Sequence, residues 1–91
     1  MGLLITTTGV MAPIAPKAGK KYPLEQLQEI VGGYIQCIRL SPSTVLVCDD
    51  DGKYKGYEVN DLATMILRDA FKGSDDFIVG NVLVCKTNEI D

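Results

Sequence analysis

YIQCIRLSPSTVLVCD, residues 34–49, is the stretch of this 91-residue chain that decides its fold. It holds two runs of mainly apolar and β-branched residues, 34–40 and 43–49, with Ser41-Pro42 between them. Two such runs joined by a short turn-forming pair are typical of a β-hairpin. The sequence therefore predicts two strands, connected by a tight turn, in a small sheet.

A short helix is predicted immediately before this hairpin, over residues 24–31 (LEQLQEIV). Glutamates and glutamines fill its polar positions, and the apolar residues share one broad face. These apolar residues are Leu24, Leu27, Ile30 and Val31. Pro23 suits the first turn, and one glycine of the pair Gly32-Gly33 is expected at a left-handed C-cap.

A second helix is predicted over residues 60–72. Asn60 suits the N-cap, and Asp61 complements the positive end of the helix dipole. Gly73 ends the helix. The apolar stripe consists of Leu62, Met65, Ile66 and either Ala70 or Phe71.

Three other segments are predicted to be extended. Residues 3–8 and 76–86 are strand-like, and Gly80 marks a bulge or a point of close approach in the second of them. Residues 53–59 follow a turn at Asp51-Gly52 and are expected to form a charged strand or extended segment.

The complete pattern predicts an α+β fold, with a small mixed or mainly antiparallel sheet of four or five strands and two short helices. Residues 9–23 are rich in proline and glycine, so a loop or irregular edge strand is expected there. We expect one domain over residues 1–91, with a core over 22–86 and a loop or arm over 9–21.

The predicted strands are apolar on both sides. Both sets of alternating side chains are apolar along residues 76–86 and along residues 44–48. A sheet with one wet face would alternate between apolar and polar residues. Two short helices cover about one face, so residues 9–23 or a second copy of the chain should cover the other. We expect a homo-oligomer on this ground.

Charge and residue counts exclude several function classes. Nine Lys and Arg against twelve Asp and Glu give a net charge of −3, which disfavours nucleic acid as a partner. The absence of His removes the commonest general base and metal ligand. No other acid–base pair has an identifying spacing, so we expect no enzyme, no cofactor and no metal. No apolar run is long enough to span a membrane, and the start lacks the features of a signal peptide.

The cysteines and the longest acidic run are expected to be structural or solvated. Cys37, Cys48 and Cys85 each lie within an apolar run and lack CxxC spacing, which predicts buried free thiols in a reducing cytosol. The run Asp49-Asp50-Asp51 is not followed by a loop of calcium-binding length. We expect it to be a solvated acidic turn.

The segment DGKYKGY, residues 51–57, carries the densest polar chemistry. Lys53 and Lys55 are interleaved with Tyr54 and Tyr57, and Gly56 lets the backbone approach a ligand. Such groups hold a phosphate and stack on a base. The alternative is a solvated edge hairpin whose lysines discourage edge pairing.

Three further residues are candidates for binding the same ligand. A phosphate-rich ligand requires a positive patch, which either Arg39 or the lysines of residues 17–21 would complete together with Lys53 and Lys55. Tyr34 follows a glycine pair whose amides face either an anion or a helix C-cap. Asn60 begins a helix, where anions bind, although N-capping also explains it.

Three ordered segments, LEQLQEIVGGYIQ, DDDGKYKGYEVNDLA and IVGNVLVC, resemble a family of small domains of unknown function from bacteriophages, plasmids and their bacterial hosts. That family shows LxxLQxxVGGYIE, an acidic-Gly-Lys turn before an Asn-x-x-Ala helix start, and a closing I-x-G-x-x-x-V strand. The matching positions are Leu24, Leu27, Gln28, Val31, Gly32, Gly33, Tyr34, Ile35, Gly52, Lys53, Gly56, Asn60, Ala63, Ile78, Gly80 and Val84. The resemblance covers about residues 22–86, and residues 9–21 are longer and richer in proline than the family pattern.

The resemblance implies a small phage-linked accessory protein in the cytoplasm of a bacterial host, with no activity to carry over. Such proteins often counter host defence. We expect sequestration, without catalysis, of a nucleotide immune signal of the cyclic oligonucleotide or cyclic ADP-ribose type. The alternative is a protein–protein inhibitor of a host defence protein, or an acidic DNA mimic, acting through the acidic turns at residues 49–51 and 75–76. A structural or regulatory protein with no ligand is the third possibility.

Overall fold

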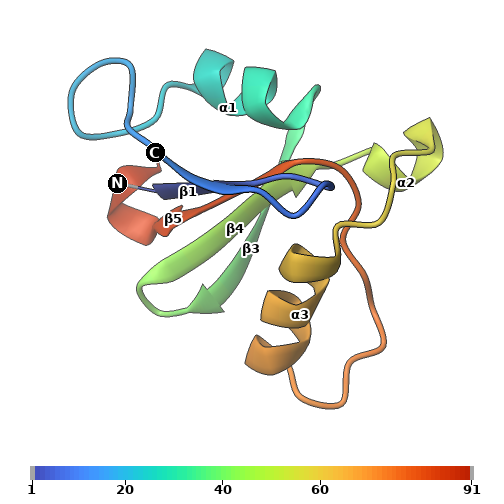
Figure 1. Cartoon of the computed structure of the whole chain (residues 1–91). Coiled ribbons are helices and arrows are strands. Elements are labelled where there is room, and N and C mark those ends of the chain that lie inside the picture. The colour runs from blue at the N-terminus through green and yellow to red at the C-terminus, as the bar shows by residue number, and fades with distance from the viewer. Residues whose placement is uncertain (1, 91) are drawn as a thin grey trace.

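The computed structural model describes residues 2–90, which form one five-stranded antiparallel sheet with helices on both of its faces (Figure 1). The spatial order of the strands is β2-β1-β5-β4-β3. This architecture confirms the predicted α+β fold class. The strands are β1 (Gly2–Ile5), β2 (Met11–Ile14), β3 (Ile35–Ser41), β4 (Thr44–Asp49) and β5 (Val82–Lys86). The helices are α1 (Leu24–Val31), α2 (Gly52–Lys55), α3 (Asp61–Ala70) and the 3-10 turn η1 (Thr87–Glu89).

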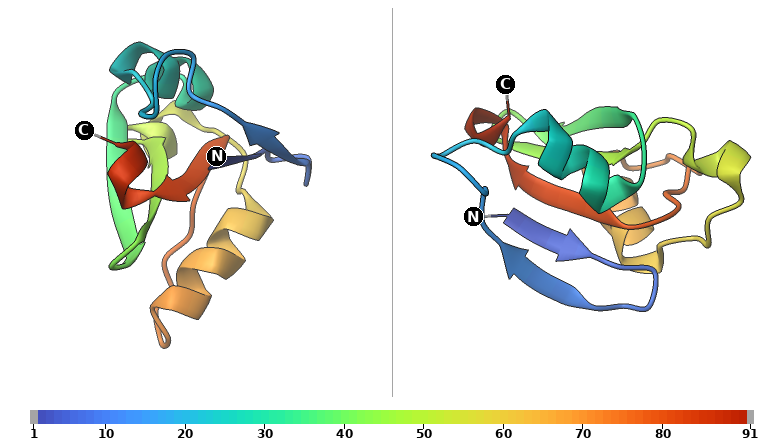
Figure 2. Two further views of the ribbon diagram at one scale, coloured as in Figure 1. Left: turned by 90° about the vertical axis from the view of Figure 1, so that its left-hand side faces the viewer. Right: turned by 90° about the horizontal axis from the view of Figure 1, so that it is seen from above.

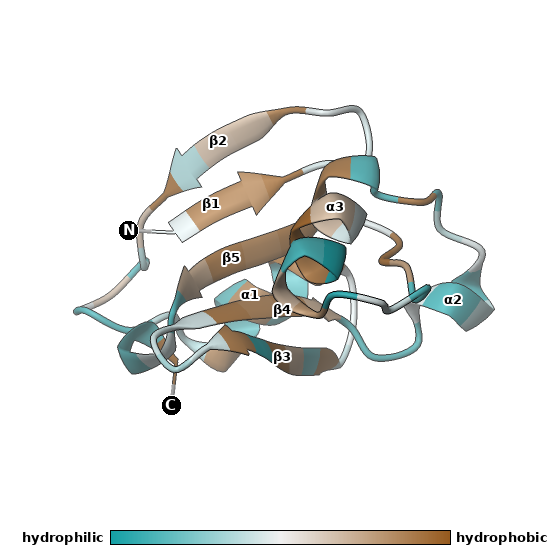
Figure 3. Ribbon diagram, turned by 90° about the horizontal axis from the view of Figure 1, so that it is seen from below, coloured by the Kyte–Doolittle hydropathy of each residue, from teal (hydrophilic) through white to brown (hydrophobic). Residues whose placement is uncertain are grey.

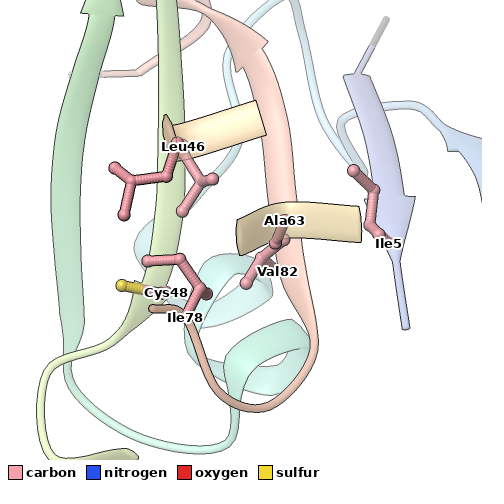
Figure 4. Close-up of a cluster of buried hydrophobic side chains, with 7 residues drawn as sticks. Ile5, Leu46, Cys48, Ala63, Ile78 and Val82 are labelled. Atoms are coloured by element: carbon pink, nitrogen blue, oxygen red, sulfur yellow. The ribbon is translucent and has the colours of Figure 1, made fainter. Parts of the chain in front are cut away.

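Each face of the sheet is covered by a different helix. Figure 2 shows α1 on one side of the strands and α3 on the other. The α3 side holds one buried cluster (Figure 4), which consists of Ile5, Leu46, Cys48, Ala63, Leu67, Ile78 and Val82. The α1 side holds a second cluster, which consists of Tyr22, Leu27, Val31, Val45, Val47, Leu83 and Cys85. Successive residues of β4 and β5 alternate between the two clusters, as the strand period requires.

This arrangement changes the argument for a homo-oligomer. We expected two short helices to cover one face, and either residues 9–23 or a second copy of the chain to cover the other. Instead, α1 and α3 cover opposite faces of the central strands, whose brown ribbons lie between them in Figure 3. The apolar character of both faces therefore has an explanation within one chain, and self-association has to rest on other grounds.

The N-terminal part is an edge hairpin rather than a free arm. β2 pairs antiparallel with β1 and carries Pro13, which an edge strand tolerates. The buried hydroxyl of Tyr22 accepts a hydrogen bond from the Gly2 N–H at 2.6 Å and donates to the Ile14 carbonyl at 2.5 Å. The buried Gln26 amide of α1 holds the chain after β2, because it bonds to both the Ala15 carbonyl and the Lys17 N–H. Of residues 9–23, where we expected a loop or an irregular edge strand, Met11–Ile14 form an edge strand.

Local sequence signals correctly predict the end of α1 and the start of α3. Gly32 follows α1 with a φ of 95°, and its N–H bonds to the Gln28 carbonyl at 2.7 Å. Asn60 caps α3, where its side-chain oxygen accepts from the Ala63 N–H at 3.0 Å. α3 ends at Ala70, slightly before the predicted end at residue 72.

Three predictions for segments before residue 60 need correction. The first strand ends at Ile5, because Thr6 to Gly9 form the turn into β2. The β3–β4 turn is centred one residue later than predicted, on residues 42–43. Residues 52–55 form the one-turn helix α2 instead of a strand.

The last strand begins at Val82 rather than at residue 76. The backbone before it is bound elsewhere, because the Ile78 N–H bonds to the Thr64 hydroxyl and the Ile78 carbonyl accepts from Asn60 N. The turn at Gly80, with a φ of 78°, separates this segment from β5. Across residues 2–90, no helix is long and apolar enough to cross a membrane.

Candidate functional site

Helix α2 lies at the end of the sheet, directly after β4 (Figure 1). It is a single turn in which the N–H groups of Tyr54 and Lys55 bond to the Asp51 carbonyl. Gly56 ends it with a φ of 75°. The two lysines of α2 point to different sides of the sheet. Lys55 reaches the end of α1, whereas Lys53 reaches residues 76 and 77.

On the α1 side, Lys55 and Tyr57 meet the buried carboxylate of Asp49. Lys55 Nζ lies 2.7 Å from Asp49 Oδ2, and the Tyr57 hydroxyl donates to the same oxygen at 3.1 Å. Asp49 Oδ1 accepts from the Asp51 N–H at 2.8 Å. Burial raises the pKa of Asp49, but these hydrogen bonds outweigh burial and hold it below its usual value. The bond to Asp49 raises the pKa of Lys55, so at neutral pH both members of the pair are ionised.

Four glycines enclose the Asp49–Lys55–Tyr57 cluster. A Cβ at Gly32 would lie 2.8 Å from the Tyr57 hydroxyl, and one at Gly80 would lie 2.7 Å from Cδ2 of the Tyr57 ring. Both glycines have a positive φ. A Cβ at Gly33 would collide with Lys55 Nζ, and one at Gly52 would lie 3.4 Å from the Tyr57 ring. The glycines therefore let the end of α1, helix α2 and the turn before β5 pack on one tyrosine.

On the α3 side, α2 borders a pocket of about 430 Å³, which we call the α2 pocket. Its lining residues are Gln36, Ile38, Cys48, Asp49, Asp50, Lys53, Tyr54, Asp76, Phe77, Ile78 and Val79. Lys53 Nζ lies 2.6 Å from Asp76 Oδ1 and 4.3 Å from the centroid of the Phe77 ring. This bond from Lys53 lowers the pKa of Asp76, with help from the Phe77 N–H. Because the Asp49 carboxylate is held on the α1 side, the lining presents two carboxylates, those of Asp50 and Asp76, and one ammonium group, that of Lys53.

The wall of the α2 pocket opposite α2 is fixed to α3. The Arg68 guanidinium donates to the carbonyls of Asp76 and Asp75, at 3.0 and 3.2 Å. The Thr64 hydroxyl and the Asn60 N–H hold Ile78. The carboxylate and ring that contact Lys53 therefore sit on a segment that α3 positions.

The structure separates the predicted ligand-binding residues. Lys53 and Tyr54 line the α2 pocket, whereas Lys55 and Tyr57 bind Asp49 on the other side. Arg39 does not join them, because Gln36 and Ile38 of β3 line the pocket and odd-numbered β3 residues point to the opposite face. The predicted patch of Lys53, Lys55 and Arg39 is not formed.

The other candidates are also apart from a common ligand site. Asn60 is fully buried, and its amide donates to the carbonyls of Ile5 and Gly80 at 3.0 and 2.9 Å. With its oxygen on the Ala63 N–H, Asn60 is a structural N-cap and not a surface ligand. Tyr34 is exposed, and its backbone carbonyl accepts from the Asp50 N–H. Gly56 has no atom near its missing Cβ.

Sequence analysis missed Asp49, which we expected in a solvated turn. The residue is only 6% exposed and is the acceptor of three hydrogen bonds. The alternation of side chains along β4 could have revealed its burial. Val45, Val47 and Asp49 occupy every second position, so all three face the α1 side. The lining residues Asp76 and Phe77 were missed as well, because they belong to an irregular segment that we predicted to be strand.

The cysteines are free, but only two of them are buried. Cys37 is exposed at the edge strand β3, which corrects the prediction for this residue. Burial raises the pKa of the Cys48 thiol to about 11, so the thiol in the α2 pocket is protonated at neutral pH. Among residues 2–90, no group of three His, Cys, Asp or Glu side chains is placed to hold a metal ion.

Comparison with protein families gives one match, which covers residues 3–91 and is described as a domain of unknown function, DUF3846. The chain belongs to the DUF3846 family. No curated protein and no solved structure matches it. The membership agrees with the resemblance to a family of small domains of unknown function.

In this DUF3846 domain, the motif residues that we singled out converge in space. The glycine pair after α1, the glycine that opens α2 and the glycine before β5 all surround Tyr57 or Asp49. Asn60 joins the same region, because its amide bonds to the Gly80 carbonyl. These residues assemble the end of the sheet on which α2 is mounted, and the α2 pocket lies beside them.

The stability of the domain is expected to be nearly flat between about pH 5 and 8, because no histidine titrates there. The fold lowers the pKa of Asp49 and Asp76, so their stabilisation is complete above the unfolded value of 3.8 and is lost as the pH falls below it. Burial raises the pKa of Cys48 from 9.0 to about 11, so stability also falls as the pH rises from 9.0 toward 11. Melting temperatures followed by circular dichroism across this range test the profile. A stability transition centred between about pH 5 and 8 would contradict it.

Proposed function

We propose that this chain is a non-catalytic binding protein, which attaches to another protein through the surface around the α2 pocket. We call this surface the α2 face and define it by Asp50, Asp51, Tyr54, Asp76 and Phe77. In the bacteriophage or plasmid setting that the resemblance implies, the partner is a defence protein in the host cytoplasm. The chain then acts as an inhibitor by occupying the partner's surface.

Tyr54 is the observation that carries the proposal. Its side chain is 92% exposed on a one-turn helix that the Asp49 cluster holds in place. Phe77, on the other side of the α2 pocket, is also exposed. Exposed aromatic side chains on a rigid surface with a neighbouring pocket are typical of the residues that dominate protein–protein binding.

The charge of the α2 face supports a basic partner. Asp50 and Asp76 line the α2 pocket, and Asp51 and Asp75 are their neighbours along the chain. Carboxylates arranged around a binding surface accelerate encounter with a positively charged partner and repel negatively charged ones. The two acidic turns that the sequence places far apart are therefore neighbours in the fold.

The protonation states favour binding over catalysis. Asp49 is ionised and bound to Lys55, Lys55 is protonated, and the thiol of Cys48 keeps its proton at neutral pH. Acid–base or nucleophilic catalysis requires a group whose pKa lies near the working pH, or an activated nucleophile. None of these three groups meets that requirement.

Sequestration of a cyclic nucleotide is the second candidate, and one observation favours it. Tyr54 offers an exposed ring for base stacking beside a pocket of about 430 Å³. The phosphates are the difficulty, because Lys53 is paired with Asp76 and Lys55 with Asp49. A phosphate-rich ligand would have to displace carboxylates from both lysines, so we place this candidate second.

The test of the binding proposal compares variants of the chain in one complex. A host protein that co-purifies with the wild-type chain is isolated, and its dissociation constant is measured by calorimetry for each variant. Tyr54→Ala is expected to weaken the complex by about thirtyfold or more, because aromatic anchors contribute at least about 2 kcal/mol. Asp50→Ser with Asp51→Ser should slow association, with the largest effect at low salt.

Leu24→Ala is the matched control. Leu24 is 56% exposed at the start of α1, on the opposite side of the sheet. The control variant should bind the partner as tightly as the wild-type chain. If Tyr54→Ala binds as well as Leu24→Ala, the α2 face is not the binding surface.

A further inference from the structure

We propose that the α2 pocket receives an arginine side chain of the partner protein, and that Lys53 occupies this position until the partner arrives. The inference rests on the proposed binding function and specifies what that function recognises. It follows from three features of the pocket: a cation already held there, a carboxylate without a cationic partner, and aromatic walls.

Lys53 shows how the pocket holds a positive charge. Its ammonium lies between a carboxylate and an aromatic ring, at 2.6 Å from Asp76 Oδ1 and 4.3 Å from the Phe77 centroid. A cation within about 6 Å of a ring centroid is attracted by the ring's negative face. The same two groups would bind a guanidinium, which is planar and forms paired hydrogen bonds with a carboxylate.

Lys53 is able to leave this position. Its side chain is 48% exposed, and that of Asp76 is 57% exposed. Ion pairs exposed to this extent contribute little to stability, so the flexible lysine side chain can move into solvent without disturbing the fold. Asp76 and Phe77 stay in place, because Arg68 of α3 holds their segment.

Asp50 provides the second carboxylate. It lines the α2 pocket, and no cationic side chain among residues 2–90 forms an ion pair with it. Tyr54 stands beside it on α2. A guanidinium that enters the pocket therefore meets Asp76 and Phe77 on one wall, and Asp50 and Tyr54 on the other. The rigid fork of arginine can use both walls, whereas a lysine ammonium satisfies one at a time.

This assignment makes an unusual prediction for Lys53→Met. Removing a positive charge from an anion-binding site weakens binding, but removing the resident cation from a cation-binding site strengthens it. The probe is the peptide acetyl-Gly-Gly-Arg-Gly-Gly-amide, and its neutral counterpart carries citrulline in place of arginine. Both are titrated into the isotope-labelled full chain, and amide shifts are followed by NMR.

The wild-type chain is expected to bind the arginine peptide weakly, with shifts concentrated at residues 50, 53, 54 and 76–78. Lys53→Met should tighten that binding about tenfold, because the ring and the carboxylate are then free for the incoming guanidinium. The citrulline peptide should give no such gain. Asp50→Asn in the Lys53→Met background should reverse part of it.

Lys72→Met is the matched control, because Lys72 is also paired with a carboxylate but lies outside the α2 pocket. It should leave arginine binding unchanged, and both variants should melt close to the wild-type temperature.

Unchanged or weaker binding of the arginine peptide by Lys53→Met overturns the assignment. If that happens while Tyr54→Ala still disrupts the partner complex, the binding function stands and only its arginine recognition falls. If Lys53→Met binds arginine tightly and Tyr54→Ala leaves the complex intact, the pocket stands and the proposed function falls.

Discussion

Gly80→Ala is expected to lower the free energy of unfolding by about 2–5 kcal/mol, which is a large part of the stability of a domain this size. Gly80 has a φ of 78°, and a Cβ there would lie 2.7 Å from Cδ2 of Tyr57. The left-handed conformation costs an alanine about 1–2 kcal/mol, and the collision adds about 1–3 kcal/mol of overpacking. Urea denaturation followed by circular dichroism measures the loss.

Gly56→Ala is the control that separates the two contributions. Gly56 has a similar φ of 75°, but no atom lies within 4 Å of the position of its Cβ. It should lose only the conformational part, about 1–2 kcal/mol. In a Tyr57→Ala background, Gly80→Ala should cost no more than Gly56→Ala does. Equal losses for both glycines in the wild-type background would show that contact with Tyr57 is not the reason for glycine at position 80.

Asn60→Ala is expected to destabilise the chain by about 3–7 kcal/mol. Its oxygen caps α3 through the Ala63 N–H, and its amide bonds to two carbonyls, those of Ile5 and Gly80. Loss of the N-cap costs about 1 kcal/mol. Each buried carbonyl left without a donor adds about 1–3 kcal/mol. Thermal and urea unfolding at neutral pH measure the sum.

The variant Asn60→Asp separates the two roles of the side chain, which are hydrogen-bond donation by its amide and capping of α3 by its oxygen. Aspartate keeps the oxygen that caps α3, but it presents a carboxylate to the Ile5 and Gly80 carbonyls. At neutral pH this variant should be at least as unstable as Asn60→Ala, and acidification should restore part of the loss because a protonated carboxyl can donate. Asn81→Asp is a matched control at an exposed amide, whose oxygen accepts from the Thr7 N–H. An Asn60→Asp variant as stable as this control would contradict the role of the buried amide.

Features that depend on neighbouring residues were predictable from the sequence. Gly32 marks the end of α1 and Asn60 marks the start of α3, because a C-cap and an N-cap require only their own turn. The edge character of β2 followed in the same way from Pro13.

Features that depend on distant contacts were not predictable. The sequence of α2 resembles an extended segment, and it becomes a helical turn because Lys55 binds buried Asp49 and Gly52 packs on Val79. The placement of α1 and α3 on opposite faces depends on where the chain crosses the sheet, which apolar periodicity does not specify.

The candidate site was predicted in part. Lys53 and Tyr54 do line a pocket, but their grouping with Arg39 failed because position 39 of β3 points to the other face of the sheet. The partners of Lys53 lie in an irregular segment after α3, and pairing between residues 53 and 76 leaves no pattern in the sequence. Two residues that line the pocket could thus be named from the sequence, whereas the pairing of Lys53 with a carboxylate became visible only in the structure.

The central claim is that the α2 pocket recognises positive charge. Its most direct measurement is the melting temperature of the wild-type chain with the arginine peptide, compared with a cyclic dinucleotide and cyclic ADP-ribose at the same concentration. Because the peptide binds weakly, all ligands are added at about ten times the dissociation constant that NMR gives for the peptide; this concentration stabilises the fold by about 1.4 kcal/mol, which the melting temperature resolves. We predict that the arginine peptide raises the melting temperature and that neither nucleotide does. Stabilisation by a nucleotide, with none by the peptide, would contradict the claim.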